Sequence, residues 1–194
     1  MCQLLGMNCN VPTDICFSFA GFRARGGLTD HHRDGWGIAF FEGTGARVFL
    51  DPCASAGSPV AELVRNYPIR SLNVIAHIRK ATQGAVRLEN THPFQRELWG
   101  RYWIFAHNGH LLDYRPVLSG RFLPVGSTDS ERAFCHILDA LAHRFADGPP
   151  PPVALHGALR ELATGIGRHG EFNFLLSDGE RHAHWAGRAF QLLC

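Results

Sequence analysis

Apolar residues recur along this chain with two periods, one typical of helices and one typical of strands. Ile15, Phe19 and Phe22 are three to four residues apart, which places them on one face of a helix. The helices predicted from such patterns and their capping residues cover residues 14–25, 58–66, 127–145 and 153–167. Runs rich in β-branched and aromatic residues predict strands over residues 2–9, 36–42, 47–51, 72–79, 102–107, 172–177 and 181–185.

The order of these elements predicts the fold class. Short turns join neighbouring strands, at residues 43–46 in the first half and at Asp178-Gly179 in the second, so antiparallel hairpins dominate. The two long helices are adjacent in the sequence, between two groups of strands, instead of alternating with single strands. This order is typical of an α+β protein. With 194 residues and no internal repeat, we expect one domain spanning residues 1–194.

Composition narrows the classes of function. The net charge is +2 and the basic residues are scattered, so we expect neither a nucleic acid nor an acidic membrane surface as a partner. No apolar run has membrane-spanning length, and the N-terminus lacks the basic and apolar regions of a signal peptide. These features predict a cytoplasmic protein.

Cysteine and histidine are numerous enough to raise the question of a metal site. The six cysteines contain no Cys-x-x-Cys pair, and without an export signal we expect them to be reduced thiols. The twelve histidines show neither His-Glu-x-x-His spacing nor the paired spacing of a zinc finger. We therefore predict no structural metal and no cofactor.

The second residue of the chain is a cysteine, Cys2, directly after the initiator methionine. Methionine is normally removed before a small residue, which would leave a thiol and a free α-amine on Cys2. The amine has an ordinary pKa of about 7.7–8.0, so it can act near neutral pH as the base for its own side-chain nucleophile. The alternative is that Cys2 is only a buried apolar residue of the first strand.

Three other positions place polar groups next to apolar runs. Arg79 ends one predicted strand, where a guanidinium can hold a carboxylate with two hydrogen bonds or form an ion pair at the rim. Asn108-Gly109 follows another strand and offers a side-chain amide and a backbone N–H to an oxyanion, although the pair also suits a type I′ turn. Asp129 lies near a helix start, where a carboxylate is usually a cap.

Taken together in chain order, these segments resemble the glutaminase domain of class II glutamine amidotransferases, in the N-terminal-nucleophile hydrolase superfamily. The resemblance runs from Cys2 to about Asp178. It is closest to the stand-alone, YafJ-like branch, and it implies an αββα sandwich, in which two stacked antiparallel sheets have helices outside. The segments that carry it are Cys2, His77-x-Arg79, Ala81-Thr82-x-Gly84, His107-Asn108-Gly109, Thr128-Asp129-Ser130-Glu131, Asp34-Gly35-Trp36-Gly37-Ile38 and Thr91-His92-Pro93-Phe94.

The same resemblance implies roles for individual residues. Cys2 would be the nucleophile, with its α-amine as the base. Asn108 and the backbone N–H of Gly109 would form the oxyanion hole. Arg79 would bind the α-carboxylate of glutamine and Asp129 its α-ammonium. A zwitterionic headgroup needs one fixed cation and one fixed anion, so the chemistry agrees with this assignment.

Two further residues are candidates for substrate binding, and one alternative concerns the base. His77 and Thr82 belong to the same segments as Arg79, and we expect them to bind substrate as well. The alternative is a Cys2 thiol activated by a neighbouring histidine, His77 or His107, as in the commoner Cys-His arrangement.

The expected reaction is hydrolysis of L-glutamine to glutamate and ammonia through a γ-glutamyl thioester, with ammonia passing to an acceptor enzyme in trans. Two alternatives remain open: a hydrolase acting on a larger γ-glutamyl amide, and a catalytically silent γ-glutamyl-binding subunit of a complex. Lys80 and Gln83 replace rings that synthase-linked domains have, so substrate enclosure differs here. The resemblance fades after Trp185, which indicates a truncated chain or a shortened second sheet. Oligomeric state is not predicted.

Overall fold

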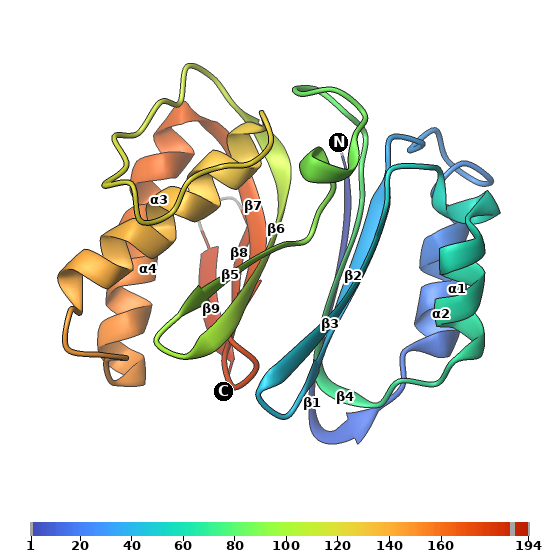
Figure 1. Ribbon diagram of the computed structural model, residues 1–194, viewed down its shortest axis with the longest axis horizontal. Coiled ribbons are helices and arrows are strands. Elements are labelled where there is room, and N and C mark those ends of the chain that lie inside the picture. The colour runs from blue at the N-terminus through green and yellow to red at the C-terminus, as the bar shows by residue number, and fades with distance from the viewer. Residues whose placement is uncertain (1, 187–188, 194) are drawn as a thin grey trace.

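The structure is a computed structural model that describes residues 2–186 and 189–193. Two antiparallel sheets lie face to face, and each carries a pair of helices on its outer face (Figure 1). The first sheet has the strand order β1-β4-β2-β3 and the second has the order β5-β6-β7-β8-β9. The predicted αββα sandwich is therefore confirmed.

Helices and strands follow one another along the chain in the order that the sequence predicts. The helices are α1 (Cys16–Ala24), α2 (Pro59–Asn66), α3 (Asp129–Arg144) and α4 (Pro152–Ile166). The strands are β1 (Gln3–Thr13), β2 (Trp36–Glu42), β3 (Gly45–Asp51), β4 (Ser71–Ile78), β5 (Phe94–Leu98), β6 (Arg101–Leu111), β7 (Gly170–Ser177), β8 (His182–Ala186) and β9 (Ala189–Leu193). All four predicted helices and seven predicted strands are present, with bounds shifted by a few residues. Strands β5 and β9 were not predicted, and β9 extends the second sheet beyond Trp185.

Apolar side chains form three layers, one between the sheets and one under each helix pair. Phe19 and Trp36 belong to the layer between α1, α2 and the first sheet. Ile75 and Ile104 belong to the layer between the two sheets. Because the central strands are covered on both faces, the residues of β2 and β4 are almost continuously buried instead of alternating between buried and exposed.

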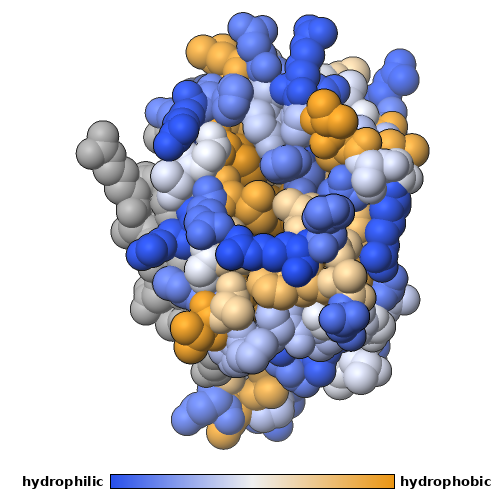
Figure 2. Space-filling model, turned by 90° about the vertical axis from the view of Figure 1, so that its left-hand side faces the viewer, coloured by the Kyte–Doolittle hydropathy of each residue, from blue (hydrophilic) through white to orange (hydrophobic). Residues whose placement is uncertain are grey.

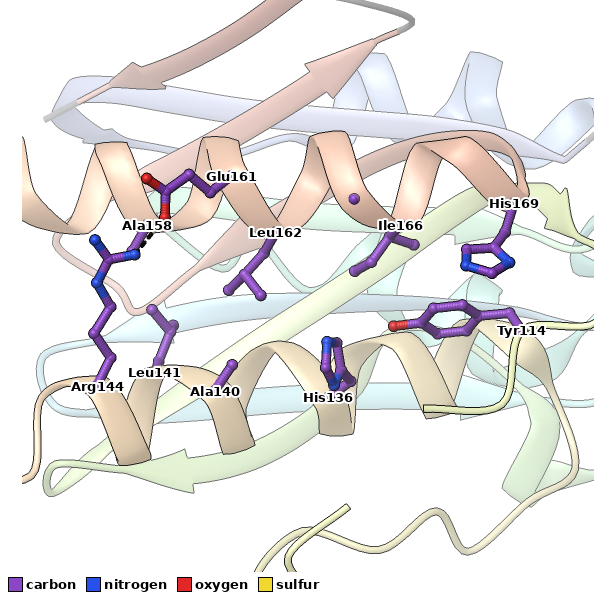
Figure 3. A pocket seen from close by; sticks show the side chains of 11 residues that line it. Tyr114, His136, Ala140, Leu141, Arg144, Ala158, Glu161, Leu162, Ile166 and His169 are labelled. Atoms are coloured by element: carbon purple, nitrogen blue, oxygen red, sulfur yellow. Dashed lines mark hydrogen bonds and ion pairs between the residues drawn. The ribbon is translucent and has the colours of Figure 1, made fainter. Parts of the chain in front are cut away.

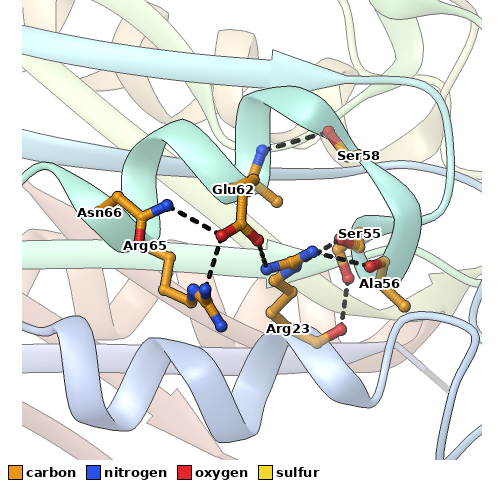
Figure 4. Close-up of polar contacts among 8 residues, drawn as sticks. Arg23, Ser55, Ala56, Ser58, Glu62, Arg65 and Asn66 are labelled. Atoms are coloured by element: carbon orange, nitrogen blue, oxygen red, sulfur yellow. Dashed lines mark hydrogen bonds and ion pairs between the residues drawn. The ribbon is translucent and has the colours of Figure 1, made fainter.

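A polar network joins α1 and α2 on the outer face of the first sheet (Figure 4). Arg23 of α1 donates from Nε to the Ser55 carbonyl (3.0 Å) and pairs with Glu62 of α2. Glu62 also accepts from Arg65, at 2.6 Å. Ser58 caps α2 by accepting from the Ala61 N–H at 3.2 Å, as predicted. This network holds α1 and α2 against each other, and Figure 1 shows both helices on the face of the first sheet that is turned away from the second sheet.

Two expectations from composition concern reduced cysteines and membrane-spanning segments. The five cysteines within the described residues are all free thiols, and Cys194 lies outside those residues. Among the described helices, none is both long enough and apolar enough to cross a lipid bilayer.

Candidate active site

Cys2 lies directly before β1 of the first sheet and contacts β6 of the second sheet. Strand β1 pairs with β4 so that Gln3 is opposite Ile78, and this register brings Cys2 next to the residues that follow β4. The Cys2 Sγ is 3.3 Å from the backbone nitrogen of Lys80 and 3.4 Å from its carbonyl oxygen. The Cys2 backbone nitrogen donates to Asn108 Oδ1 of β6, at 2.9 Å. Cys2 and Asn108, which are 106 residues apart in the chain, are thus in direct contact.

The surroundings of Cys2 favour the neutral thiol. Burial raises the pKa of the Cys2 thiol, and Asp129 acts in the same direction, while the Lys80 backbone N–H and the Arg79 charge oppose this effect. Near neutral pH the side chain is therefore a thiol, and its use as a nucleophile requires a base beside it. While Met1 is attached, the Cys2 nitrogen is an amide. Removal of Met1 turns the same atom into an amine.

Asn108 and Gly109 occupy consecutive positions near the end of β6. Because Asn108 Oδ1 accepts from the Cys2 nitrogen, the amide presents Nδ2 as its donor on the other side. Gly109 is opposite Phe172 of β7, and a Cβ at position 109 would lie only 1.9 Å from the Glu171 carbonyl oxygen. Glycine is required there, because any side chain would force β6 and β7 apart.

The Arg79 side chain is buried under the loop that follows it. Only 2% of Arg79 is exposed, and its guanidinium donates to the carbonyls of Gln83 (2.7 Å), Gly84 (3.0 Å) and Ala85 (3.0 Å). Burial lowers the pKa of Arg79, opposed by nearby acidic groups that include Asp129. In this structure the guanidinium therefore shapes the loop at residues 80–85, a role that the sequence did not indicate.

Asp129 is the first residue of α3 and connects that helix to β6. Its Oδ2 accepts from the Leu111 N–H at 2.7 Å, and its Oδ1 accepts from the Ser130 N–H at 2.9 Å. Asp129 is 5% exposed, and within residues 2–186 and 189–193 it forms no ion pair. A buried carboxylate without a cation is costly, and it is suited to receive a cationic group of a ligand.

The other two candidate binding residues occupy different environments. His77 is completely buried and stacks on His92, with 4.2 Å between ring centroids. Burial lowers the pKa of His77 to about 3, so the ring is neutral at physiological pH. Thr82 is exposed in the loop after Arg79. Neither placement provides a contact that supports a role in substrate binding, and both roles stay predictions.

Two residues that the sequence analysis did not single out position the loop beside Cys2. Asp34 Oδ2 accepts from the Ala81 N–H at 2.8 Å. Asn90 donates to the Ala85 carbonyl (3.0 Å) and accepts from the Ser127 N–H (2.8 Å), which joins the loop to the segment before α3. Asp34 lies in the Asp-Gly-Trp-Gly motif that contributed to the resemblance, so a signal for it was present in the sequence.

The fold and the site together define a class of protein. Two antiparallel sheets between helical layers make this chain an αββα sandwich protein, and Cys2 lies directly before β1. Among the described residues, no group of three or more histidine, cysteine, aspartate or glutamate side chains is arranged to hold a metal ion.

Comparison with known proteins identifies the family. Residues 1–193 match the family of class II glutamine amidotransferases, and the chain belongs to this family of enzymes. It is 58% identical over 181 residues to a candidate glutamine amidotransferase of Haemophilus influenzae, covering 93% of this chain and 61% of that protein. It is 53% identical over 195 residues to the candidate glutamine amidotransferase YafJ of Escherichia coli, covering 97% of this chain and 76% of YafJ. The predicted likeness to YafJ is confirmed.

A solved structure and a more distant relative complete the comparison. The crystal structure of a predicted glutamine amidotransferase from Pseudomonas aeruginosa matches with a TM-score of 0.74 and 43% identity, covering 95% of this chain and 72% of that one. A γ-glutamyl-hercynylcysteine sulfoxide hydrolase of Mycobacterium tuberculosis is 32% identical over 134 residues, covering 64% of this chain and 52% of that protein.

Proposed function

We propose that this protein, after removal of Met1, hydrolyses the side-chain amide of L-glutamine through a thioester on Cys2. The α-amine of Cys2 takes the thiol proton while Sγ attacks the amide carbon. Asn108 Nδ2 and the Gly109 N–H stabilise the resulting oxyanion. The amine returns its proton to the leaving nitrogen, and ammonia departs. Water then attacks the thioester, which releases glutamate and restores the thiol.

The observation that carries this proposal is the 2.9 Å contact between the Cys2 nitrogen and Asn108 Oδ1. The atom that becomes the amine is therefore within hydrogen-bond distance of the amide that would receive the oxyanion. It also fixes the Asn108 amide before substrate binds, so its donor group is oriented in advance. Such preorganised donors contribute much of the rate enhancement in acyl-transfer enzymes.

The glutamine headgroup would be recognised by opposite charges on two elements. Asp129 offers a buried carboxylate without an ion-pair partner among the described residues, which suits the α-ammonium. Arg79 supplies the positive charge for the α-carboxylate, which would approach over the loop at residues 80–85 or replace a carbonyl on the guanidinium. Thr82, which is exposed in that loop, would contribute a hydroxyl. His77 would support the site from the core.

The family uses glutamine together with an ammonia acceptor, and we propose that the acceptor here is an enzyme encoded by another chain. A second candidate is the hydrolysis of a larger γ-glutamyl amide by the same steps. The relative named as a γ-glutamyl-hercynylcysteine sulfoxide hydrolase favours this candidate. Both reactions use the same nucleophile and headgroup, and they differ only in the leaving amine.

A panel of amides tests both candidates on the purified chain. Ammonia release from L-glutamine and amine release from γ-glutamyl amides would be compared for wild type, Cys2→Ala and Cys9→Ala, a control on the same strand. We expect turnover in wild type and Cys9→Ala and none in Cys2→Ala. A kcat/KM for a larger amide well above that for glutamine would select the second candidate. Equal turnover by Cys2→Ala would contradict both.

A further inference from the structure

A cavity of about 350 Å³ lies between α3 and α4, on the helical face of the second sheet (Figure 3). This volume is within the range of small-molecule sites. The cavity is separate from Cys2, which lies between the two sheets. Figure 2 shows this face of the molecule, where apolar surface lies in a hollow between hydrophilic side chains. The side chains that define the cavity are Tyr114, His136, Leu141, Leu162, Ile166 and His169.

Tyr114 brings a polar group into this cavity without a partner for it. The residue follows β6, is 7% exposed, and projects between the two helices toward Ile166 (Figure 3). Its ring packs edge-on against His169, with 5.0 Å between centroids, and against His136, at 6.1 Å. The hydroxyl is buried and has no hydrogen-bond partner within the described part of the chain. Buried tyrosine hydroxyls are normally hydrogen-bonded, so a ligand in this cavity could supply the partner that the Tyr114 hydroxyl lacks among the described residues.

Tyr114 and His136, two polar groups that line the cavity, are neutral. Burial raises the pKa of Tyr114, which therefore keeps its proton and can donate. Burial also lowers the pKa of His136, so its ring is uncharged near pH 7. At one end Arg144 of α3 and Glu161 of α4 pair with each other at 2.5 Å, and their charges largely compensate. An ion inside the cavity would lose its hydration without an opposite charge to replace it.

Shape and polarity together restrict the ligand. The aliphatic side chains of Leu141, Leu162 and Ile166 provide apolar walls, while the rings of Tyr114 and His169 offer aromatic faces and edges. A flat ring fits between such surfaces, and aromatic pairs gain from edge-to-face contact. An acceptor on the ligand would pair the Tyr114 hydroxyl. An apolar side chain of a partner protein would fill the space but would leave that hydroxyl unpaired.

We propose that the cavity between α3 and α4 binds a small neutral aromatic or heteroaromatic molecule whose carbonyl oxygen accepts a hydrogen bond from the Tyr114 hydroxyl. This site is independent of the proposed glutaminase chemistry, because none of its residues belongs to the group around Cys2. The elements that form it are α3, α4 and the segment after β6.

Benzamide, a neutral ring with one carboxamide, is a suitable probe, and toluene is its counterpart without an acceptor. Binding to the full chain would be followed by chemical-shift changes in assigned NMR spectra. The variant Tyr114→Phe removes only the hydroxyl, and Tyr102→Phe, at an exposed tyrosine outside the cavity, is the matched control. Activity is not the readout, so the test stands whether or not the chain hydrolyses glutamine.

We expect benzamide to shift the resonances of His136, Leu162 and His169 in wild type and Tyr102→Phe, and to bind Tyr114→Phe about tenfold more weakly, the effect of one lost hydrogen bond. Toluene should bind both tyrosine variants equally. Absence of shifts at the cavity, or equal benzamide affinity for wild type and Tyr114→Phe, would overturn the proposal. Tighter binding of toluene than of benzamide would also overturn it and would indicate an apolar side chain of a partner.

Discussion

Asn108 accepts a hydrogen bond from the Cys2 nitrogen through its side-chain oxygen, and its amide hydrogens are proposed to stabilise the oxyanion, so its removal should affect turnover far more than folding. Asn108→Ala should lower kcat about 10²–10³-fold with a smaller change in KM, as expected for one lost oxyanion donor. Steady-state kinetics with glutamine, together with a thermal melt, would measure both effects. Asn66→Ala on α2 is the control. A large loss of stability with unchanged kcat would show that Asn108 is only structural.

Asp129 accepts two backbone N–H groups and is proposed to bind the substrate ammonium. In Asp129→Asn the charge is lost and one side-chain atom becomes a donor facing a donor. We expect kcat/KM for glutamine to fall by roughly 2–4 kcal/mol, as when one partner leaves a desolvated ion pair. For an analogue that lacks the α-amino group, kcat/KM should fall much less in this variant, because that analogue has no ammonium to pair with the Asp129 charge. Asp139→Asn, on the same helix, should leave both values near wild type.

At this scale the sequence predicted Cys2, Asn108, Gly109, Arg79 and Asp129 as candidates, and the structure places Asn108 against Cys2. The sequence did not predict that loop carbonyls surround the Arg79 guanidinium, because this arrangement depends on the backbone path of an irregular segment. The substrate-binding role of His77 stays a prediction, and the structure adds that its ring is fully buried. A polar residue near a strand end points inward or outward according to register, which residue type does not fix.

Among the elements, the loop between β4 and β5 lies beside Cys2, and Asp34 holds its beginning. Asp34→Ala frees the Ala81 N–H and should lower kcat/KM by about 1–2 kcal/mol, mainly through KM. The loop contains trypsin sites at Lys80 and Arg87, so limited proteolysis gives a direct structural readout. Cleavage there should accelerate in Asp34→Ala but not in Asp30→Ala. Unchanged cleavage and kinetics would mean that Arg79 and Asn90 hold the loop without help from Asp34.

Most elements were predictable because each carries a clear apolar face or an apolar run. Strand β5 was not, because Gln95, Arg96 and Glu97 are consecutive polar residues and only Phe94 and Leu98 at its ends are buried. Its position follows from pairing with β6, which is a tertiary interaction. The predicted helix starts agreed within about two residues, since Ser58 and Thr128 both act as side-chain caps.

For the whole molecule, the buried imidazoles predict how stability depends on pH. The folded pKa of His77 is about 3, and burial also lowers the pKa values of His92 and His107. Below about pH 6.5 the unfolded chain binds protons that the folded chain does not. The free energy of unfolding should therefore decrease as the pH is lowered, by roughly 1 kcal/mol per pH unit for each such group. Urea unfolding at several pH values between 7.5 and 5 would measure this slope.

A matched pair of variants separates this contribution from that of the carboxylates. His77→Leu should reduce the slope of the unfolding free energy against pH, because one buried imidazole is gone. The absolute stability of this variant also changes. His143→Leu removes an exposed histidine and should leave the slope unchanged. Identical slopes in all three proteins would show that the imidazole buried between the sheets does not govern the acid sensitivity.

The central claim for the molecule is that Cys2, as the first residue of the mature chain, is the nucleophile. Incubation with 6-diazo-5-oxo-L-norleucine, a glutamine-like electrophile, followed by intact-mass and peptide mapping, tests this claim most directly. We predict one adduct, located on Cys2 of chains that lack Met1, and no adduct on a variant that retains an N-terminal extension. An adduct on Cys2 of a chain whose mass includes Met1, or on another thiol such as the exposed Cys53, would contradict it.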